Sequence, residues 1–380
     1  MSHPYGAPPI PWSSRPRVDN RRPSQPSIAA SISNIMYKNA VYYPNYRVYR
    51  GETPASLNFS CISHVFYAFA HVGPDGGVFL SDEWADMQMP VDGATGCLGS
   101  FMRLKQQHEH LQLIISIGGG AASQNFAQVA ASAATRDHFG KSVRGLVDAT
   151  GFNGIDIDWE HPSDPEQGRN FLALLAAIRL HLPDERYLLT AALPAGRWAL
   201  QNIDLYKAQD YLDLINLMAY DFSGSWSHRS GHHAQLYPGN MPDAANGSAA
   251  VDYVISTGFP ASKILLGVPV YGRSFLNSRG PGHPYHGCGG EEGTFEYKLL
   301  PRPGTQEVVD TAAVSASCYG GDGGWVSYDN PQTVKIKAEY CRQRRLGVGW
   351  LFSVSCECLL IKFRVCFTGQ GQQMHQVREV

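Results

Sequence analysis

Short apolar segments recur along the chain and alternate with segments of helical periodicity. The runs with strand character lie at 39–46, 62–72, 111–120, 154–160, 187–194, 211–221, 263–272 and 346–353. Between two of them, residues 136–151 repeat apolar side chains at the spacing of one helical face and end at Gly151, a helix stop. Residues 169–182 are also expected to be helical. Strand and helix repeated eight times predict an α/β protein with a (β/α)8 TIM barrel.

One interval between predicted strands is much longer than the others. Tyr271 and Leu346 are separated by far more than the ~30 residues of a βαβ unit. Within this interval, residues 294–300 and 324–331 have the composition of short strands bounded by turns. We therefore expect a small α+β insertion at about 274–340, between strands seven and eight and beside the mouth of the barrel.

In the fourth predicted strand, three acids alternate with apolar residues. Side chains on a strand point to opposite faces in turn, so Asp156, Asp158 and Glu160 share one face, about 6.6 Å apart along the backbone. Ile155 and Trp159 belong to the other face, which in a barrel packs on helices. The acidic face then points into the lumen, with Glu160 at the C-terminal rim, where such barrels hold their active sites.

Three neighbouring acids on one face oppose one another's ionisation. We expect one aspartate to hold a proton and the pKa of Glu160 to be raised, which would make Glu160 a general acid. The spacing alone leaves two alternatives open. In the first, Asp156, Asp158 and Glu160 form a purely structural acid ladder, which Arg or Lys from neighbouring strands would neutralise. In the second, the D-x-D-x-E pattern binds Mg²⁺ or Mn²⁺.

The composition excludes some classes of partner. The 380 residues are 43% hydrophobic, which suffices for a large core. Thirty-one basic and thirty-three acidic residues give a net charge of −2, so we expect no nucleic-acid partner and no membrane partner. Eight cysteines without a C-x-x-C pair do not indicate a disulfide scaffold.

The two ends of the chain differ in composition from the predicted barrel, which we assign to residues 33–355. Residues 1–32 are rich in Pro, Ser and Arg and lack the apolar core of a signal peptide, so we expect a disordered tail there. This predicts a cytoplasmic protein, with extracellular or cell-wall action after unconventional export as the alternative. Residues 356–380 are expected to be a diverged or disordered C-terminal tail.

Several stretches, in order along the chain, resemble motifs of glycoside hydrolase family 18, the chitinases. NGIDIDWE at 153–160 resembles the family's D-x-x-D-x-D-x-E signature, with Asn153 in place of the first acid. The other matching stretches are YAFA (67–70), SIGG (116–119), MAYD (218–221), GVPVYGR (267–273) and WVSYDNP (325–331). The resemblance spans about residues 37–353 and is strongest to the fungal-type branch with an α+β insertion.

This resemblance implies a chitinase that hydrolyses β-1,4 bonds between N-acetylglucosamine units with retention and needs no cofactor or metal ion. The family uses the 2-acetamido group of the substrate as nucleophile instead of a second carboxylate. By resemblance, Glu160 protonates the leaving oxygen and Asp158 orients the acetamide N–H. Asp156 would share a proton with Asp158, and Tyr220 would donate to the acetamide oxygen. The expected partner is chitin or a chito-oligosaccharide, and the expected state is a monomer.

The resemblance also implies a set of substrate-binding residues around these four. Met218 and Asp221 would line the acetamide pocket, and Arg273 would form an ion pair at the cleft. Tyr67 and Phe69 are expected to share a face of their strand, either against the sugar or filling the lumen. The full substrate-binding set is Tyr67, Trp84, Gly119, His161, Met218, Asp221, Arg273 and Trp350.

The chain departs from the family pattern at several positions. Gly120 stands where many members have a Trp, which would remove a stacking platform on the leaving-group side, and His161 stands where many have a Tyr. Trp350 is expected to floor the sugar site, although Phe352 would fit the same role. Beyond Ser353 the closing helix is not recognisable. Two alternatives to a chitinase therefore stay open: an inactive chitin-binding lectin, and an endo-β-N-acetylglucosaminidase that acts on N-glycans.

Overall fold

The computed structural model describes residues 38–352, and for 348–352 the backbone alone. The predicted tails at 1–32 and 356–380 lie outside the described residues.

Eight parallel strands pair side by side, and the pairing of the first strand with both the second and the last closes them into a barrel. In order around the barrel they are β1 (Ala40–Pro44), β2 (His64–Val72), β6 (Gln112–Gly118), β7 (Gly154–Asp158), β8 (Leu188–Pro194), β9 (Leu214–Met218), β10 (Ile264–Pro269) and β16 (Val348–Phe352). The predicted TIM barrel is confirmed.

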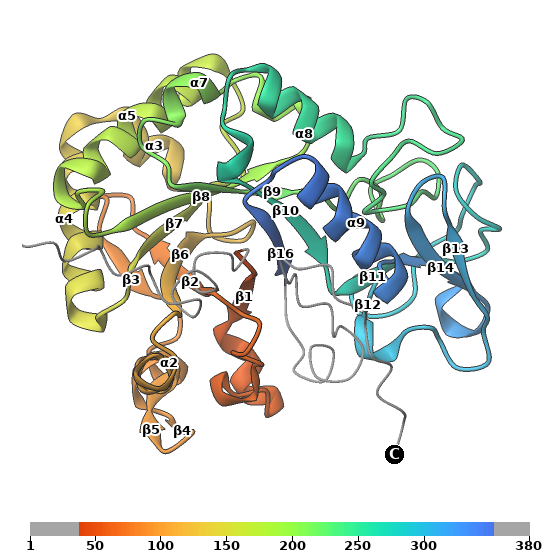
Figure 1. Ribbon diagram of the computed structural model, residues 1–380, viewed down its shortest axis with the longest axis horizontal. Helices are drawn as coiled ribbons and strands as arrows, with labels where there is room; N and C mark the ends of the chain where they lie inside the picture. Colours follow the sequence, from red (N-terminus) through yellow and green to blue (C-terminus); the bar gives the residue numbers. More distant parts are fainter. Residues whose placement is uncertain (1–37, 353–380) are drawn as a thin grey trace, which may run out of the picture. The chain divides into compact units, whose positions relative to one another are not determined.

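Helices cover the outside of this barrel (Figure 1). They are α2 (Gly96–Gln107), α3 (Phe126–Ala131), α4 (Ala133–Thr150), α5 (Pro165–His181), α6 (Arg197–Leu200), α7 (Leu205–Ala208), α8 (Gly247–Ser256) and α9 (Pro331–Gln343). The predicted stop at Gly151 is confirmed, because its left-handed backbone (φ 72°) ends α4 and its N–H bonds the carbonyl of Val147. Helix α5 begins before the predicted residue 169, because Asp164 caps it through the N–H of Gln167 and Pro165 suits its first turn.

Strand alternation divides the apolar side chains between two layers. The inner layer fills the barrel and includes Tyr42, Phe66 and Ala68, whereas the outer layer packs against the helices and includes Val65 and Tyr67. This division decides which face of each strand is able to contribute to a site in the lumen.

A second sheet is inserted between β10 and β16, as expected. Its strands run antiparallel in the order β12-β11-β15-β14-β13 and lie beside α9 in Figure 1. They are β11 (Tyr271–Phe275), β12 (Thr294–Glu296), β13 (Glu307–Asp310), β14 (Ser315–Tyr319) and β15 (Trp325–Tyr328). Because β11 follows β10 directly, the insertion begins at the C-terminal end of a barrel strand and flanks the barrel mouth.

Three short strands lie in the segment that follows β2. Strand β3 (Val78–Leu80) pairs antiparallel with the end of β2, and β4 (Pro90–Val91) forms a hairpin with β5 (Ala94–Thr95).

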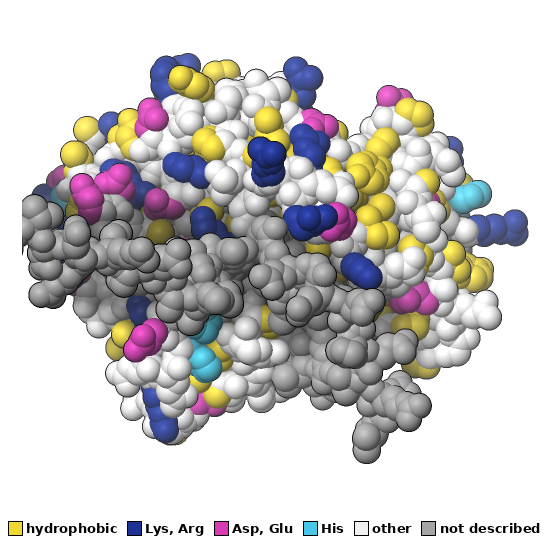
Figure 2. Space-filling view, in the orientation of Figure 1, with side chains coloured by type: hydrophobic (Ala, Val, Ile, Leu, Met, Phe, Trp, Pro, Cys, Tyr) yellow, Lys and Arg dark blue, Asp and Glu magenta, His cyan; other side chains and the backbone are white. Residues whose placement is uncertain are grey.

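On the face shown in Figure 2, Lys and Arg side chains are spread among Asp and Glu over the described helices. Within residues 38–352, no helix combines the length and the apolar character needed to span a bilayer.

Candidate active site

The acid ladder lies on the inner face of β7. Asp156 pairs in register with Ser116 of β6 and Thr190 of β8, both within the barrel wall. On the opposite face, Ile157 belongs to the outer layer, and the Trp159 ring stacks on that of Phe126 with centroids 5.7 Å apart. The predicted division of acidic and apolar faces is therefore confirmed.

Asp156 is fully buried and accepts four hydrogen bonds from neutral donors. Its Oδ2 accepts from the hydroxyls of Tyr42 (2.7 Å) and Ser116 (2.8 Å). Its Oδ1 accepts from the hydroxyl of Thr190 (2.6 Å) and the amide of Asn216 (3.1 Å). Burial raises the pKa of Asp156, and the four hydrogen bonds oppose this rise. Because neutral groups satisfy this carboxyl, the alternative of a ladder neutralised by Arg or Lys does not describe Asp156.

Asp158 is buried but lacks the partners that Asp156 has. The residue is 2% exposed, and its Oδ1 is buried without a hydrogen-bond partner. Burial, followed by the charges of Glu160 and Asp156, raises the pKa of Asp158 well above its ordinary range. A buried polar atom left without a partner costs about 1–3 kcal/mol. Such an atom on the inner face of a barrel strand is suited to a ligand's donor.

Glu160 lies one step further along the strand direction and reaches solvent. Its side chain is 30% exposed, and its backbone N–H donates to the Ser123 hydroxyl (2.9 Å). Gly120 leaves room beside the carboxyl, since a Cβ there would stand 3.4 Å from Oε1. Burial and the charge of Asp221 raise the pKa of Glu160, against a hydrogen bond from the Gly120 backbone. A partly exposed acid with a raised pKa is able to deliver a proton near neutral pH.

The segment after β9 carries Met218, Tyr220 and Asp221 to the same end of the barrel. Tyr220 is buried, and its ring meets that of Tyr271 edge-on with centroids 6.3 Å apart. Burial, and then the charges of Tyr271, Asp158, Asp221 and Glu160, raise the pKa of Tyr220 well above its ordinary range. The phenol therefore stays a neutral O–H donor. Met218 packs against the inner layer of the barrel.

Asp221 is bound by two basic side chains, Arg273 and His233. Arg273 donates from Nε to Oδ1 (2.7 Å) and from Nη2 to Oδ2 (2.7 Å). Nδ1 of the fully buried His233 lies 3.4 Å from Oδ1. Burial alone would raise the pKa of Asp221, but hydrogen bonds from His233 and Arg273 outweigh burial and hold the pKa well below its ordinary range. Asp221 is therefore a fixed negative charge, and the ion pair predicted for Arg273 is present.

Trp226 covers this ion pair from the loop after β9. The Arg273 guanidinium lies 4.5 Å from the centroid of the Trp226 ring, a cation–π contact that fixes one face of the indole. The ring remains more than half exposed. An exposed indole offers a flat apolar face of the kind that packs on a sugar ring.

Gly118 and Gly119 bring the end of β6 against β7. A Cβ on Gly118, which has a φ of +113°, would lie 2.2 Å from the carbonyl of Asp158. Gly119 donates its N–H to that carbonyl (2.9 Å) and lies under the ring of Phe69. Gly119 thus positions the end of β7. The Phe69 ring lies against Gly119, which we expected to contact the sugar.

The expectation that Tyr67 binds substrate is wrong. Tyr67 is fully buried in the outer layer, where its ring packs against Phe101 and its hydroxyl donates to Asp86. The pairing of β2 with β6 shifts register between Ala68 and Ala70, so residues before and after this point follow different alternations. Tyr67 and Phe69 therefore point to opposite sides of β2, and only Phe69 joins the inner layer.

The remaining predicted substrate-binding residues occupy different surroundings. His161 follows Glu160, with its Nε2 3.8 Å from Oε2 of the acid, and burial lowers its pKa to about 4. Trp84 is exposed at the start of a π-helical turn, η4 (Trp84–Gln88), in the loop after β3. Trp350 is on β16, opposite Gly267 of β10, but its side chain lies outside the described part of the structure. The roles of Trp84 and Trp350 stay predictions.

Asn153 does not point at the acids. Its Oδ1 accepts from Lys105 and from the backbone N–H of Leu113 (2.9 Å), and its own N–H donates to the Leu113 carbonyl (2.7 Å). Asn153 therefore holds the entry of β7 to β6, a role that survives the replacement of an acid by an amide.

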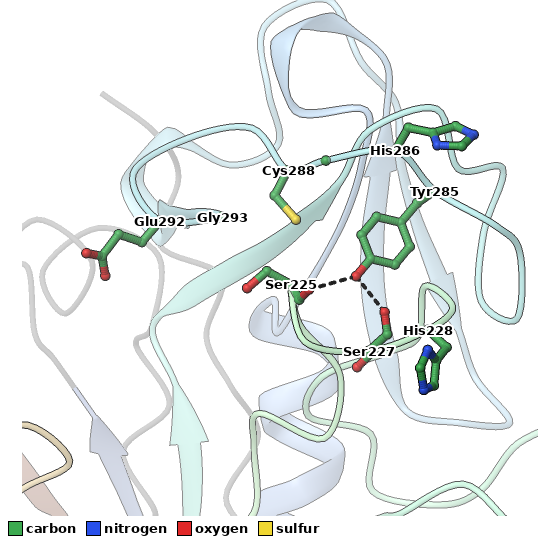
Figure 3. Close-up of a pocket in the computed structure, with 9 residues that line it drawn as sticks. Ser225, Ser227, His228, Tyr285, His286, Cys288, Glu292 and Gly293 are labelled. Carbon is green, nitrogen blue, oxygen red and sulfur yellow. Dashed lines mark hydrogen bonds between the residues drawn. The ribbon is translucent and has the colours of Figure 1, made fainter.

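A polar depression of about 640 Å³ lies between the loop after β9 and the loop that joins β11 to β12 (Figure 3). Tyr285 joins the two sides, because its hydroxyl donates to the carbonyls of Ser227 (2.6 Å) and Ser225 (3.1 Å). Cys288 and Glu292 line the same depression. Ser225 and Ser227 flank Trp226 in the chain, so Tyr285 anchors the segment that carries the tryptophan over Arg273.

The structure gives roles to residues whose contacts the motifs did not reveal. The four donors to Asp156 come from β1, β6, β8 and β9, and three of them were visible in the sequence as single polar residues in apolar strands: Ser116, Thr190 and Asn216. No pattern singled out Tyr42 or Trp198. Among the described residues, no group of three or more His, Cys, Asp or Glu side chains is arranged to hold a metal ion.

Comparison with known proteins agrees with this geometry. The family model for glycosyl hydrolases family 18 matches residues 38–357. Endochitinase 1 of Metarhizium robertsii is 38% identical over 346 residues, which cover 84% of this chain and 82% of the relative. Chitinase 1 of Aphanocladium album is 39% identical over 339 residues, which cover 82% and 79% of the two chains.

Solved structures place the same fold beside a bound oligosaccharide. A GH18 chitinase from Cycas revoluta in complex with (GlcNAc)3 superposes with a TM-score of 0.75 at 30% identity, over 85% of this chain and 97% of the other. The closed barrel, the acid ladder on β7 and the match over most of the chain lead to one assignment. The chain belongs to glycosyl hydrolases family 18.

Proposed function

We propose that this protein is a chitinase, which hydrolyses β-1,4 bonds between N-acetylglucosamine units with retention. The observation that carries the proposal is the buried, unpartnered Oδ1 of Asp158, between the well-bonded Asp156 and the partly exposed Glu160. A 2-acetamido sugar offers an N–H donor for such an atom. Relatives named endochitinase and chitinase, at 38% and 39% identity, support the same substrate class.

The described residues supply each part of a substrate-assisted reaction. Glu160 gives its proton to the glycosidic oxygen as the bond to the anomeric carbon breaks. The acetamide oxygen of the same sugar attacks that carbon and forms an oxazolinium ion, while the acetamide N–H donates to Asp158. The Tyr220 hydroxyl donates to the acetamide oxygen and aligns it for attack. Water then adds to the anomeric carbon and returns a proton to Glu160, which regenerates the acetamide and retains the configuration.

The role first expected for Asp156 needs a movement. Both of its oxygens are already engaged by donors, and Asp158 has no hydrogen bond to it in the described residues. For the two carboxyls to share a proton, the Asp158 side chain would have to turn towards Asp156. In the orientation seen here, Asp158 is instead available to the acetamide.

The function is tested by the release of a fluorophore from aryl glycosides of chitobiose and chitotriose. Release, together with the cleavage of chitohexaose, is the expected result. Binding of chitohexaose without release would favour the lectin alternative. Cleavage confined to the chitobiose core of N-glycans would favour the endo-β-N-acetylglucosaminidase alternative.

Chelation should leave the activity unchanged. The reaction proposed here uses carboxyl, phenol and acetamide groups and assigns no step to a metal ion. We expect dialysis against EDTA to preserve the rate on chitotriose aryl glycoside within about twofold. If EDTA abolished the activity and Mg²⁺ or Mn²⁺ restored it, the result would support the interpretation of the acid ladder as a metal site.

Asp221→Asn should move the alkaline limb of the pH–rate profile to lower pH. The fixed negative charge of Asp221 disfavours a second negative charge on Glu160 and so raises the pKa of Glu160. The substitution removes that charge and leaves the charge of Arg273 uncompensated. Both changes lower the pKa of Glu160, so Glu160 loses its proton at a lower pH. The measurement is kcat/KM against pH.

A matched control for this shift is Asp252→Asn. Asp252 of α8 forms an ion pair with Arg344, just beyond α9, on the outside of the barrel. Its replacement removes the same charge from a similar pair and should leave the alkaline limb in place. An unchanged or upward shift in Asp221→Asn would contradict the electrostatic role of Asp221.

A further inference from the structure

Trp198 is an exposed tryptophan held beside the proposed acid. It lies on α6, directly after β8, and 63% of its surface is exposed. Single exposed aromatic residues are common on proteins and need no function. The position of this one is distinctive, because its ring meets the ring of His161 edge-on with centroids 5.6 Å apart, and His161 in turn lies 3.8 Å from Glu160.

The indole is supported on a second side by backbone. A Cβ on Gly196 would lie 2.3 Å from Nε1 and 2.6 Å from Cδ1 of Trp198, so the ring edge rests on this glycine. Only a residue without a side chain permits this approach. His161 and Gly196 together limit the motion of the ring while one part of it faces solvent.

The loop that carries His161 and the short helix α6 that carries Trp198 are also tied to each other, and α6 contacts the neighbouring helix α8. The Asn202 amide, after α6, donates to the carbonyl of Pro162 (3.2 Å). The Arg197 guanidinium lies 5.3 Å from the ring centroid of Tyr253 on α8. The residues that follow Trp198, Ala199 and Leu200, are fully buried. A ring fixed in this way loses little conformational freedom when a ligand stacks on it.

We propose that Trp198, held by His161 and Gly196, is a stacking platform for an N-acetylglucosamine unit on the leaving-group side of the cleavage point. The inference rests on the proposed function. Asp158 and Tyr220 hold the attacked sugar inside the barrel mouth, and Glu160 protonates the bond on the outer side of that sugar. The leaving sugar therefore lies over the loops after β7 and β8, where His161 and Trp198 stand.

This platform also compensates for the open space at Gly120. Gly120 places no side chain beside the Glu160 carboxyl, so the loop after β6 offers no ring there. The pyranose face of N-acetylglucosamine carries C–H groups that pack on an indole, which makes tryptophan suited to this sugar. The loop after β8 thus supplies the aromatic surface that the loop after β6 lacks.

The test compares two substrates in Trp198→Ala. Chitohexaose occupies the leaving-group side with sugars, whereas chitobiosyl fluoride leaves only a fluoride ion and does not reach Trp198. We expect kcat/KM for chitohexaose to fall about tenfold, equivalent to about 1.4 kcal/mol, mainly through KM. We expect the value for chitobiosyl fluoride to stay within about twofold, and Trp198→Phe to recover most of the loss on chitohexaose.

A matched control is Tyr206→Ala. Tyr206 lies on α7 and is equally exposed, at 63%, so its removal tests the loss of any surface ring of this kind. It should change neither rate. Unchanged hydrolysis of chitohexaose in Trp198→Ala would overturn the platform. An equal loss on both substrates would overturn the leaving-group assignment, because the effect would then lie on the attacked sugar or on the acid.

A binding measurement separates this inference from the proposed function. With Glu160→Gln as background, the affinity for chitohexaose by isothermal titration calorimetry should fall about tenfold when Trp198→Ala is added. If the unmutated protein cleaves neither substrate, the proposed function fails, yet this binding difference still supports or refutes the platform. Equal affinities with and without the indole would refute it.

Discussion

Glu160→Gln should lower the turnover of chito-oligosaccharides by about 10²–10⁴-fold or more while binding persists. The amide keeps the shape of the carboxyl beside Gly120 but has no proton to give to the leaving oxygen. Asp158 and Tyr220, which hold the acetamide, are unchanged. The effect should therefore appear in kcat, and the affinity measured by calorimetry should stay near that of the unmutated protein.

The control for this substitution is Glu166→Gln. Glu166 is an exposed carboxylate in the first turn of α5, only a few residues beyond Glu160. Its replacement makes the same chemical change outside the barrel mouth and should leave turnover unchanged. Near-normal turnover in Glu160→Gln would mean that another group protonates the leaving oxygen, and the assignment of the acid would be wrong.

Fully deacetylated chitosan should be cleaved at least about 10³-fold more slowly than an acetylated chain of the same length. The reason is that the attacking oxygen belongs to the substrate, and an intramolecular nucleophile in line with the bond is worth several powers of ten. Without the acetyl group, the substrate has no acetamide oxygen to attack the anomeric carbon. An amine also replaces the acetamide N–H that donates to Asp158. The measurement is the rate of new reducing ends from the two polymers.

The other carboxylates near Glu160 are poorly suited to replace the acetamide. Both oxygens of Asp221 are bound by Arg273, and both oxygens of Asp156 accept hydrogen bonds in the buried network. Asp158 has a free oxygen, but burial and its acidic neighbours raise its pKa well above its ordinary range, which weakens it as a nucleophile. The substrate's own acetamide remains as the attacking group.

Two further observations test the same mechanism. Proton NMR of fresh digests should show the β-anomer first, because two inversions at the anomeric carbon give retention. A thiazoline mimic of the cyclised intermediate should bind far more tightly than chitotriose, since the site stabilises the intermediate more than the substrate. The α-anomer as first product, or comparable rates on the deacetylated chain, would require the roles of the carboxylates to be reassigned.

The position of the acids could be predicted from local sequence because it depends on strand periodicity alone. Alternation with period two decides that Asp156, Asp158 and Glu160 share a face, whatever lies next to the strand. Helix ends are similarly local: Gly151 stops α4 because glycine readily adopts the left-handed conformation. These features need no knowledge of distant residues, and the structure bears them out.

The position of Tyr67 shows where local reasoning fails. Alternation predicts that Tyr67 and Phe69 share a face, but the pairing of β2 with β6 shifts register between Ala68 and Ala70. A shift of one residue exchanges the two faces of a strand. Register is set by the pairing of two strands whose partners are more than forty residues apart, so the sequence of β2 alone could not reveal it.

By itself, then, the sequence determined the barrel, the inserted sheet, the acid ladder and the family motifs, because each depends on periodicity or on contiguous residues. Only the tertiary structure decided how those groups are tuned. The donors that satisfy Asp156 come from four strands, and Asp221 keeps its charge because Arg273 and His233 reach it from other segments. Burial and charge in three dimensions set the pKa of each acid, and separation along the chain does not encode them.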